Sequence, residues 1–350
     1  MKHEAVISIQ DGNIIDSQGK KRIFKGTTIS PSSKDFPIPS VSEADNFFAT
    51  LKKSDTTLLR WQILWEDVEK DEADSYNEAY LADLRTLLKK AEDAGILVFL
   101  EPLMQDWGSS LGGHGAPAWT VEAAGLEENL DNSKKQQMMY SLFWAGKKMA
   151  PELLVEGDNI QDYLQEHYIA AMKHTARRVK DCKTVVGFGI MAKGQTGDSK
   201  AMEMYPLNFE EDCLKPFQKK FIAAFQKKHS HYLFLAESTI TGQFSTWKYD
   251  SKYHSQDIHT VQREGGVIPD ADIEASKVIT LLSFEPTKKL LGVFVSKDKQ
   301  KTAFQDKINK ALGGGNTVMV DFSPSQDLEC LQELVQETGL SYFVNIATAD

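Results

Sequence analysis

The chain has 350 residues, of which 41% are hydrophobic and 26% charged, an ordinary globular composition in a chain too long for a minimal domain. Its formal net charge of −10 argues against a nucleic-acid-binding surface, and no run approaches the roughly 18 apolar residues of a membrane-spanning helix. The three cysteines, which lie far apart, are interpreted as buried or free thiols. The first residues, MKHEAVISIQDG, have no apolar signal core, so the expected location is the cytoplasm, although a trimmed secreted form would look the same.

Short buried runs alternate with amphipathic stretches, which predicts an α/β protein built as a parallel barrel. Residues Ala5–Ser17, with an Asp11-Gly12 turn, are expected to form a hairpin that caps one end of the barrel. The eight expected barrel strands are Ile23–Ser30, Thr57–Ile63, Ile96–Leu100, Thr184–Ile190, His231–Ala236, Trp247–Tyr253, Leu290–Val295 and Thr317–Phe322. The expected helices are Val41–Lys53, a helix from about Asn77 to the stop at Gly95, Ile160–Lys180, Phe209–Lys228, Ala271–Leu282, Lys301–Leu312 and Leu328–Thr338.

Two segments do not fit this rhythm. The stretch from Glu101 to Asn159 is long, rich in glycine and tryptophan, and too aromatic to be disordered, so a functional role is favoured. The tail Ser341–Ala347 is strand-like but falls outside the eight repeats, and it is expected to pair with Ala5–Ile9.

Thr184–Ile190 is the strand around which the site is expected. Its apolar residues predict full burial, and Gly187 and Gly189 mark points where another backbone can approach closely. A polar loop follows at once. Sites in parallel barrels lie at the carboxyl ends of the strands, so the residues after Ile190 are the first candidates for function.

Several segments resemble one known family. The run GFGIMAKG, which starts at Gly187, resembles the G-F-x-x-M-N-E-P of family 5 glycoside hydrolases, and LLRWQILWEDVE resembles their second strand. The segment PLMQDWGSSLGGHGAPAWTVEAAGL aligns without a gap to P-H-Q-D-x-W-S-R-x-x-G-G-x-G-A-P-x-W-T-x-E-x-A-G of the endoglycoceramidase-related branch, which includes microbial glucosidases of glucosylceramide and steryl glucosides. The resemblance covers nearly the whole chain. It implies a single (β/α)8 TIM barrel over residues 1–350, without the C-terminal β-sandwich of that branch.

The catalytic positions implied by the resemblance carry other residues. The acid/base glutamate falls on Lys193 and the asparagine before it on Ala192. The nucleophile falls on Val293, within the segment GVFV, and the strand-three histidine falls on Leu103. In the strand-six motif, His254 is kept and the tyrosine becomes Gln256.

A retaining glycosidase needs two carboxyl groups about 5–5.5 Å apart, one a nucleophile and one a proton donor, and neither Val293 nor Lys193 can fill these roles. We therefore expect a catalytically inactive pseudoenzyme that binds a glycan, a glycolipid or a protein partner in the barrel mouth, with no cofactor and no metal. The alternative is an active O-glycosyl hydrolase that uses relocated carboxylates, Glu101 and Glu237. A third hypothesis is a scaffold whose pocket is filled.

The candidate pocket leaves individual roles open. Glu101 or Glu237 is expected to form a salt bridge with Lys193 or Arg60. Trp107 and Trp119 either stack on a sugar or sterol face or pack the Gly-rich loop. His254 serves binding or holds the strand end, and the pair His229 and His231 is interpreted as surface histidines rather than a metal site. The full set of candidate pocket residues is Arg60, Glu101, Leu103, Trp107, Trp119, Ala192, Lys193, Glu237, His254, Gln256 and Val293.

Overall fold

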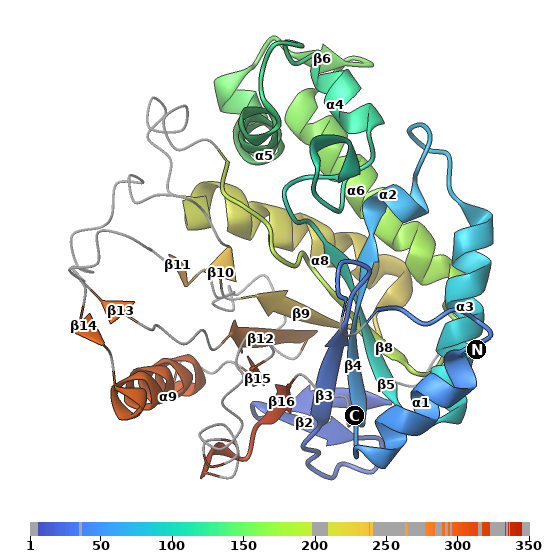
Figure 1. Cartoon of the computed structure of the whole chain (residues 1–350), viewed down its shortest axis with the longest axis vertical. Helices are drawn as coiled ribbons and strands as arrows, with labels where there is room; N and C mark the ends of the chain where they lie inside the picture. Colours follow the sequence, from blue (N-terminus) through green and yellow to red (C-terminus); the bar gives the residue numbers. More distant parts are fainter. Residues whose placement is uncertain are drawn as a thin grey trace.

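The computed structural model describes residues 6–34, 37–197, 209–237, 239–240, 263–264, 277–283, 289–290, 293–294, 296–313, 317–322, 333, 335 and 337–344. Eight parallel strands close into a barrel in the spatial order β12-β15-β16-β3-β4-β5-β8-β9, with helices packed outside it (Figure 1). These strands are β3 (Lys25–Ile29), β4 (Leu58–Leu64), β5 (Leu97–Leu103), β8 (Val185–Gly189), β9 (Leu233–Glu237), β12 (Val278–Ser283), β15 (Thr317–Asp321) and β16 (Ser341–Phe343). The predicted (β/α)8 barrel is confirmed.

The remaining elements of the described chain are helices and short antiparallel pairs. The helical elements are α1 (Ala44–Lys53), α2 (Trp65–Val68), α3 (Glu78–Asp93), η1 (Ser109–Leu111), α4 (Trp119–Ala124), α5 (Asn132–Met149), α6 (Ile160–Arg178), η2 (Glu210–Leu214), α8 (Lys215–His229) and α9 (Lys297–Gly313). The antiparallel pairs are β1 (Ile7–Gln10) with β2 (Asn13–Asp16), β6 (Leu154–Val155) with β7 (Asp158–Asn159), β10 (Thr239–Ile240) with β11 (Arg263–Glu264), and β13 (Lys289–Leu290) with β14 (Val293–Phe294). Among the described residues, no helix has the length and apolar character needed to cross a membrane.

Apolar side chains from the barrel strands fill part of the barrel interior. They form one buried cluster, made by Leu58, Phe99, Val186, Leu233, Leu235, Ile279, Leu281, Met319 and Phe343. Ile7 and Ile14, from the two strands of the β1–β2 hairpin, belong to the same cluster. The expected hairpin cap is therefore confirmed, because the hairpin buries its apolar face against the barrel interior rather than against a helix.

The second half of the barrel differs from the sequence prediction. The segment expected as the helix Ala271–Leu282 ends in a barrel strand, β12, which pairs with β9 and β15. Its run VITLLS begins with three β-branched residues, and the residues whose burial is described are all buried. Periodicity cannot tell a strand from a helix in a short, fully buried run. The expected sixth strand, Trp247–Tyr253, lies outside the described residues.

The expected seventh strand is not part of the barrel. Residues 289–290 and 293–294 form the small antiparallel pair β13–β14, and the seventh barrel strand in chain order is β15. The expected pairing of Ser341–Ala347 with Ala5–Ile9 is also wrong. Its first residues form the eighth strand, β16, which pairs in parallel with β15 and β3 and closes the ring. The helix expected over Leu328–Thr338 lies mostly outside the described residues.

The segment from Glu101 to Asn159 contains the helices α4 and α5 and is not a continuous loop. In Figure 1, α4, α5 and the β6–β7 hairpin lie together at the top, beside α6. The aromatic residues that argued against disorder are buried between these helices, among them Tyr140, Phe143 and Trp144. This helical layer encloses the Gly-rich stretch that follows β5, so the stretch has a fixed conformation.

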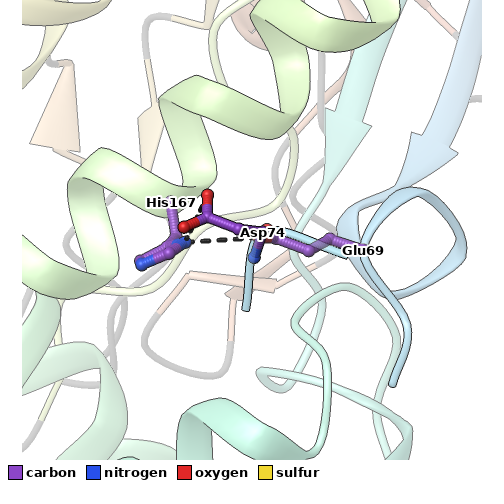
Figure 2. A group of neighbouring side chains, drawn as sticks. All are labelled: Glu69, Asp74 and His167. Atoms are coloured by element: carbon purple, nitrogen blue, oxygen red, sulfur yellow. Dashed lines mark hydrogen bonds and ion pairs between the residues drawn. The ribbon is translucent and has the colours of Figure 1, made fainter. Parts of the chain in front are cut away.

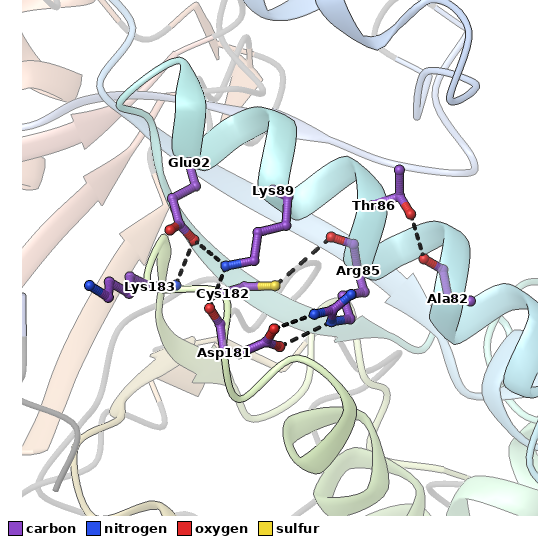
Figure 3. Close-up of polar contacts among 8 residues, drawn as sticks. All are labelled: Ala82, Arg85, Thr86, Lys89, Glu92, Asp181, Cys182 and Lys183. Atoms are coloured by element: carbon purple, nitrogen blue, oxygen red, sulfur yellow. Dashed lines mark hydrogen bonds and ion pairs between the residues drawn. The ribbon is translucent and has the colours of Figure 1, made fainter. Parts of the chain in front are cut away.

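Polar contacts fix the start of β8, the strand around which the site was expected. Figure 3 shows the C-terminal half of α3 bonded to the turn before this strand. The Arg85 guanidinium donates to the Asp181 carboxylate, with an Nε–Oδ1 distance of 3.0 Å, and the Lys183 amide donates to Glu92 Oε2 at 2.8 Å. Burial raises the pKa of the Cys182 thiol in this turn to about 11, so this cysteine is a buried free thiol, as expected. The other cysteine that is described, Cys213, is also buried.

The two glycines of β8 are required by close neighbours. A Cβ on Gly187 would lie 2.2 Å from the Leu233 carbonyl oxygen, and one on Gly189 would lie 2.2 Å from Glu101 Cγ. The close backbone approach predicted at Gly187 is confirmed, whereas at Gly189 the neighbour is the side chain of Glu101.

We expect Gly189→Ala to lower the free energy of unfolding by roughly 1–3 kcal/mol, because the new methyl group overlaps the buried Glu101 side chain. Gly313→Ala is the matched control, since a Cβ there meets nothing within 4 Å. Urea denaturation of both variants checks the expectation. Equal stability of the two variants would show that Glu101 can move aside.

Candidate functional site

A buried guanidinium joins two carboxylates inside the barrel. Arg60, on β4, donates through Nε to Glu101 Oε2 on β5 and through Nη1 to Asp321 Oδ2 on β15 at 2.8 Å. The three side chains are only 4%, 0% and 6% exposed. The expected salt bridge between Glu101 and Arg60 is thus confirmed, and Asp321 is a partner that the sequence reasoning did not name.

Asp321 was missed because the later barrel strands were numbered incorrectly from the sequence. With Leu290–Val295 counted as the seventh strand, Thr317–Phe322 was counted as the eighth. In the structure Asp321 is the last residue of the seventh strand, β15. Val293 lies on β14, outside the barrel, so it does not stand at the end of a barrel strand.

Three apolar residues lie together where β4, β5 and the segment after β8 meet. Leu64, Leu103 and Ala192 form a separate buried cluster. Ala192 is fixed by its backbone, whose N–H donates to the Pro102 carbonyl at 2.8 Å and whose carbonyl accepts from the Met104 N–H at 2.9 Å. The positions at which the resembling family has histidine and asparagine therefore offer neither a donor nor an acceptor side chain.

Lys193 follows directly, at the carboxyl end of the β8 segment. Its side chain is exposed, and its Nζ donates to Gln105 Oε1 at 3.4 Å. Glu101 accepts a hydrogen bond from Arg60, and the expected contact between Glu101 and Lys193 stays a prediction. The side chain of Glu237 lies outside the described residues, so its pairing with Lys193 stays a prediction. His254 and Gln256 also lie outside the described residues.

The two tryptophans of the candidate pocket pack the Gly-rich stretch. Trp107 and Trp119 are 0% and 8% exposed. The Trp107 indole donates to Thr120 Oγ1 at 3.0 Å, and the Trp119 indole donates to the Glu69 carbonyl at 3.1 Å. Of the two readings left open by the sequence, packing is the one that the structure shows.

Glu66 holds the same stretch and was not recognised as important from the sequence. Its Oε2 accepts from the Ser109 amide at 3.1 Å, and its Oε1 accepts from the Gly115 amide at 2.8 Å. The Glu66 amide in turn donates to the Gly115 carbonyl at 2.7 Å. The available signal was the position of Glu66 directly after a barrel strand, where a carboxylate can accept hydrogen bonds from the loop that follows the next strand.

Backbone strain gathers at the ends of β5 and β8. Asp106, Trp107 and Lys193 have left-handed backbone angles, with φ of 52°, 71° and 54°. Such angles cost of order 1–3 kcal/mol each in a residue other than glycine, and they persist only where neighbours impose them. Gln195 links the two ends, because its Nε2 donates to Asp106 Oδ1 at 2.7 Å while its carbonyl accepts from the Trp144 indole at 2.7 Å.

No family model matches the chain. A glucosylceramidase of Cryptococcus neoformans var. grubii is 32% identical over 249 aligned positions, which cover 55% of this chain and 34% of the relative. An ergosteryl-beta-glucosidase of Saccharomyces cerevisiae is 24% identical over 237 positions, which cover 49% of this chain and 31% of the relative. The chain thus spans about a third of the length of these curated relatives.

Solved structures with the same fold are also similar. Cryptococcus neoformans sterylglucosidase 1 superposes with a TM-score of 0.72 at 13% identity, covering 100% of this chain and 77% of the other. Endo-glycoceramidase II from Rhodococcus sp. superposes with a TM-score of 0.66 at 17% identity, covering 94% of this chain and 74% of the other. At these identities the superpositions show the shared barrel fold.

Removal of the buried guanidinium should destabilise the barrel strongly. Arg60→Met leaves the carboxylates of Glu101 and Asp321 buried without it, which typically costs about 3–5 kcal/mol. Chemical denaturation measures the loss, and adding Glu101→Gln and Asp321→Asn to Arg60→Met should restore part of it. A loss below about 1 kcal/mol for Arg60→Met would mean that solvent reaches the carboxylates.

Asp67, on α2, provides a pH-dependent prediction. Burial raises the pKa of its carboxyl from 3.8 to about 6, with Glu66 adding to the rise and Lys70 opposing it. The folded state therefore keeps a proton that the unfolded state releases, and this contribution to stability falls as pH rises from about 4 to 6.

We expect Asp67→Asn to stabilise the protein at pH 7.5 by roughly 1–2 kcal/mol after allowance for solvent screening, with a smaller gain at pH 4.5. Urea unfolding at both pH values tests this, with the exposed Asp71→Asn as the control. A gain of equal size at both pH values would rule out the proton linkage.

Proposed function

We propose that this chain, a relative of the endoglycoceramidase-related branch of glycoside hydrolase family 5, binds a β-glucoside-bearing lipid or glycan at the barrel mouth without hydrolysing it. The observation that carries the proposal is Lys193 at the end of β8, where the resemblance places the proton donor. The names of the relatives, glucosylceramidase and ergosteryl-beta-glucosidase, support a glycolipid as the ligand class.

Hydrolysis of a natural glucoside requires a proton for the departing oxygen, and the groups at the end of β8 do not supply one. A side-chain ammonium with its hydrogen bond to Gln105 brings a positive charge where a carboxylic acid is needed. The neighbouring Ala192 and Leu103 are buried against each other, so they add no orienting hydrogen bond. Loss of general acid catalysis alone typically costs 10²–10⁴-fold in rate.

Relocated carboxylates are the basis of the second candidate function, an active O-glycosyl hydrolase. The pair expected from the sequence was Glu101 and Glu237, whereas the described contacts bring together Glu101 and Asp321. Asp321 ends the seventh strand, the strand that carries the nucleophile in the resembling family. This placement supports Asp321, rather than Val293, as the residue in the nucleophile's position.

The shared guanidinium favours the inactive reading of that pair. Glu101 and Asp321 both accept hydrogen bonds from the Arg60 guanidinium. In these contacts they act as acceptors, whereas an acid catalyst must donate a proton to the departing oxygen. Because both carboxylates are engaged by Arg60, attack even on a donor whose leaving group departs without a proton is not expected.

Purified protein should show no turnover of aryl β-glucosides or fluorescent glucosylceramide above the uncatalysed rate. Lys193→Glu alone should restore little, because residues of a catalytic unit act together and Leu103 and Ala192 remain apolar. Turnover that is lost in Asp321→Asn, Glu101→Gln or Glu237→Gln but kept in Lys193→Ala would establish the hydrolase instead.

Two further measurements separate binding from chemistry. Thermal shift with octyl β-glucoside below its micelle concentration, with octyl β-galactoside as the stereochemical control, should show stabilisation by the glucoside. Incubation with 2,4-dinitrophenyl 2-deoxy-2-fluoro-β-glucoside, followed by intact mass measurement, should show no glycosyl adduct. An adduct that is absent in Asp321→Asn would identify that carboxylate as a working nucleophile, whereas absence of any glucoside-induced shift would contradict the binding proposal.

A further inference from the structure

Three side chains that commonly bind metals meet between α2 and α6. Glu69 follows α2 directly, Asp74 lies in the link to α3, and His167 projects from the middle of α6. Figure 2 shows the three side chains pointing toward one another. His167 Nδ1 lies 3.2 Å from Glu69 Oε1 and 3.9 Å from Asp74 Oδ1, and the three ligand atoms all lie within 4.8 Å of one another.

We propose that Glu69, Asp74 and His167 form a binding site for a divalent transition-metal ion of the Zn²⁺ type. One imidazole nitrogen and two carboxylate oxygens are a donor set that suits this class of ion. With bonds of about 2.0–2.2 Å, ligand atoms around tetrahedral Zn²⁺ lie roughly 3.3 Å apart. The observed separations are close to this value, so small side-chain rotations are enough to enclose an ion.

The surroundings hold the ligands in place, as outer contacts do in metal sites. The Glu69 carboxylate is fully buried and accepts from the Trp65 indole at 2.7 Å through its other oxygen, Oε2. The His167 ring packs against Trp119 and Tyr163, with ring centroids 5.3 and 4.5 Å away. Two of the three ligands are therefore oriented before an ion arrives.

The third ligand supplies the entrance. The side chain of Asp74 is 78% exposed, whereas those of His167 and Glu69 are 12% and 0% exposed. An ion can thus approach from solvent on the Asp74 side and keep a water molecule as its fourth ligand there. Glu69 Oε1 also accepts from the Asp74 amide at 2.6 Å, so binding would shift this contact or share the oxygen.

Charge favours a cation over the hydrogen-bonded arrangement alone. Two carboxylates face one imidazole, and a dication can neutralise both while the imidazole remains neutral. Glu69 and Asp74 lie between α2 and α3, after the second barrel strand, β4. His167 lies on α6, which precedes the fourth barrel strand, β8, so an ion bound by all three would link these two parts of the chain. A bound ion would therefore stabilise the elements that flank Trp65 and Trp119, and its effect is expected in folding stability rather than in catalysis.

The test uses the full chain after chelation and exchange into metal-free buffer, with ZnCl₂ as the probe. Isothermal titration should show one Zn²⁺ per chain, and Tm should rise in excess Zn²⁺ because the ion binds the folded state. Asp74→Asn should weaken binding at least tenfold, as loss of a contact in a metal site typically does, with little effect on the metal-free Tm because its side chain is exposed.

Control variants make the outcome specific. Asp71→Asn removes an exposed carboxylate from the same link and should leave Zn²⁺ affinity unchanged. His167→Gln should weaken binding as Asp74→Asn does. Absence of Zn²⁺ binding, or binding that survives both ligand changes but is lost in His231→Gln, would overturn the site.

Discussion

Arg60 crosses the interior of the barrel between strands on opposite sides of the ring. Three strands separate β5 from β15 in either direction around the barrel, yet Glu101 and Asp321 bind the same guanidinium. Other parts of the interior are filled by apolar side chains, and the cluster with Leu103 lies at the carboxyl end of β5. The charged layer therefore sets both the spacing of the strands and the chemistry available to the mouth, since its carboxylates are already engaged.

Around the barrel mouth, the residues that support the loops resemble those of the glycosidase branch more closely than the residues at the strand ends do. Glu66 and Trp107 fix the Gly-rich stretch through hydrogen bonds that depend on those side chains. At the strand ends beside it, Ala192 is held by backbone hydrogen bonds, which any residue can form. The resemblance to the glycosidase branch is thus strongest where side chains support the loops and weakest where side chains would contact a sugar.

The first half of the barrel was predictable from the sequence, and the second half was predictable only in kind. Strands up to β9 alternate with amphipathic helices, and their order follows directly from periodicity. Beyond β9, Val278–Ser283 is a buried run within a stretch that also has helical spacing, and β16 has only three residues. Two segments, Trp247–Tyr253 and Leu290–Val295, were counted as strands where the barrel has only β12 between β9 and β15. The strand of Asp321 was therefore counted eighth instead of seventh, which hid the role of Asp321.

The site was predictable as a set of positions but not as a set of contacts. The sequence placed Arg60 within the second strand, Glu101 at the end of the third and Lys193 just after the fourth, and parallel strands share one carboxyl edge. It could not show that Glu101 binds Arg60 while Lys193 donates to Gln105. Several charged or polar partners were available to each side chain, and sequence position alone does not choose among them. Nor did it reveal the meeting of His167 with Glu69, because the two residues are separated by nearly a hundred positions and no spacing rule links them.

The closure of the ring by β16 has a consequence for the order of events during synthesis. The first barrel strand, β3, pairs with a strand that emerges about three hundred residues later, and the Phe24 amide donates to Ser341 Oγ across this interval. Contacts of such long sequence separation form slowly, because the loop between them must first be ordered. While the ribosome extends the chain, one edge of β3 therefore offers unpaired backbone groups to any neighbouring strand. The edge stays open until residues 341–343 emerge and pair with it.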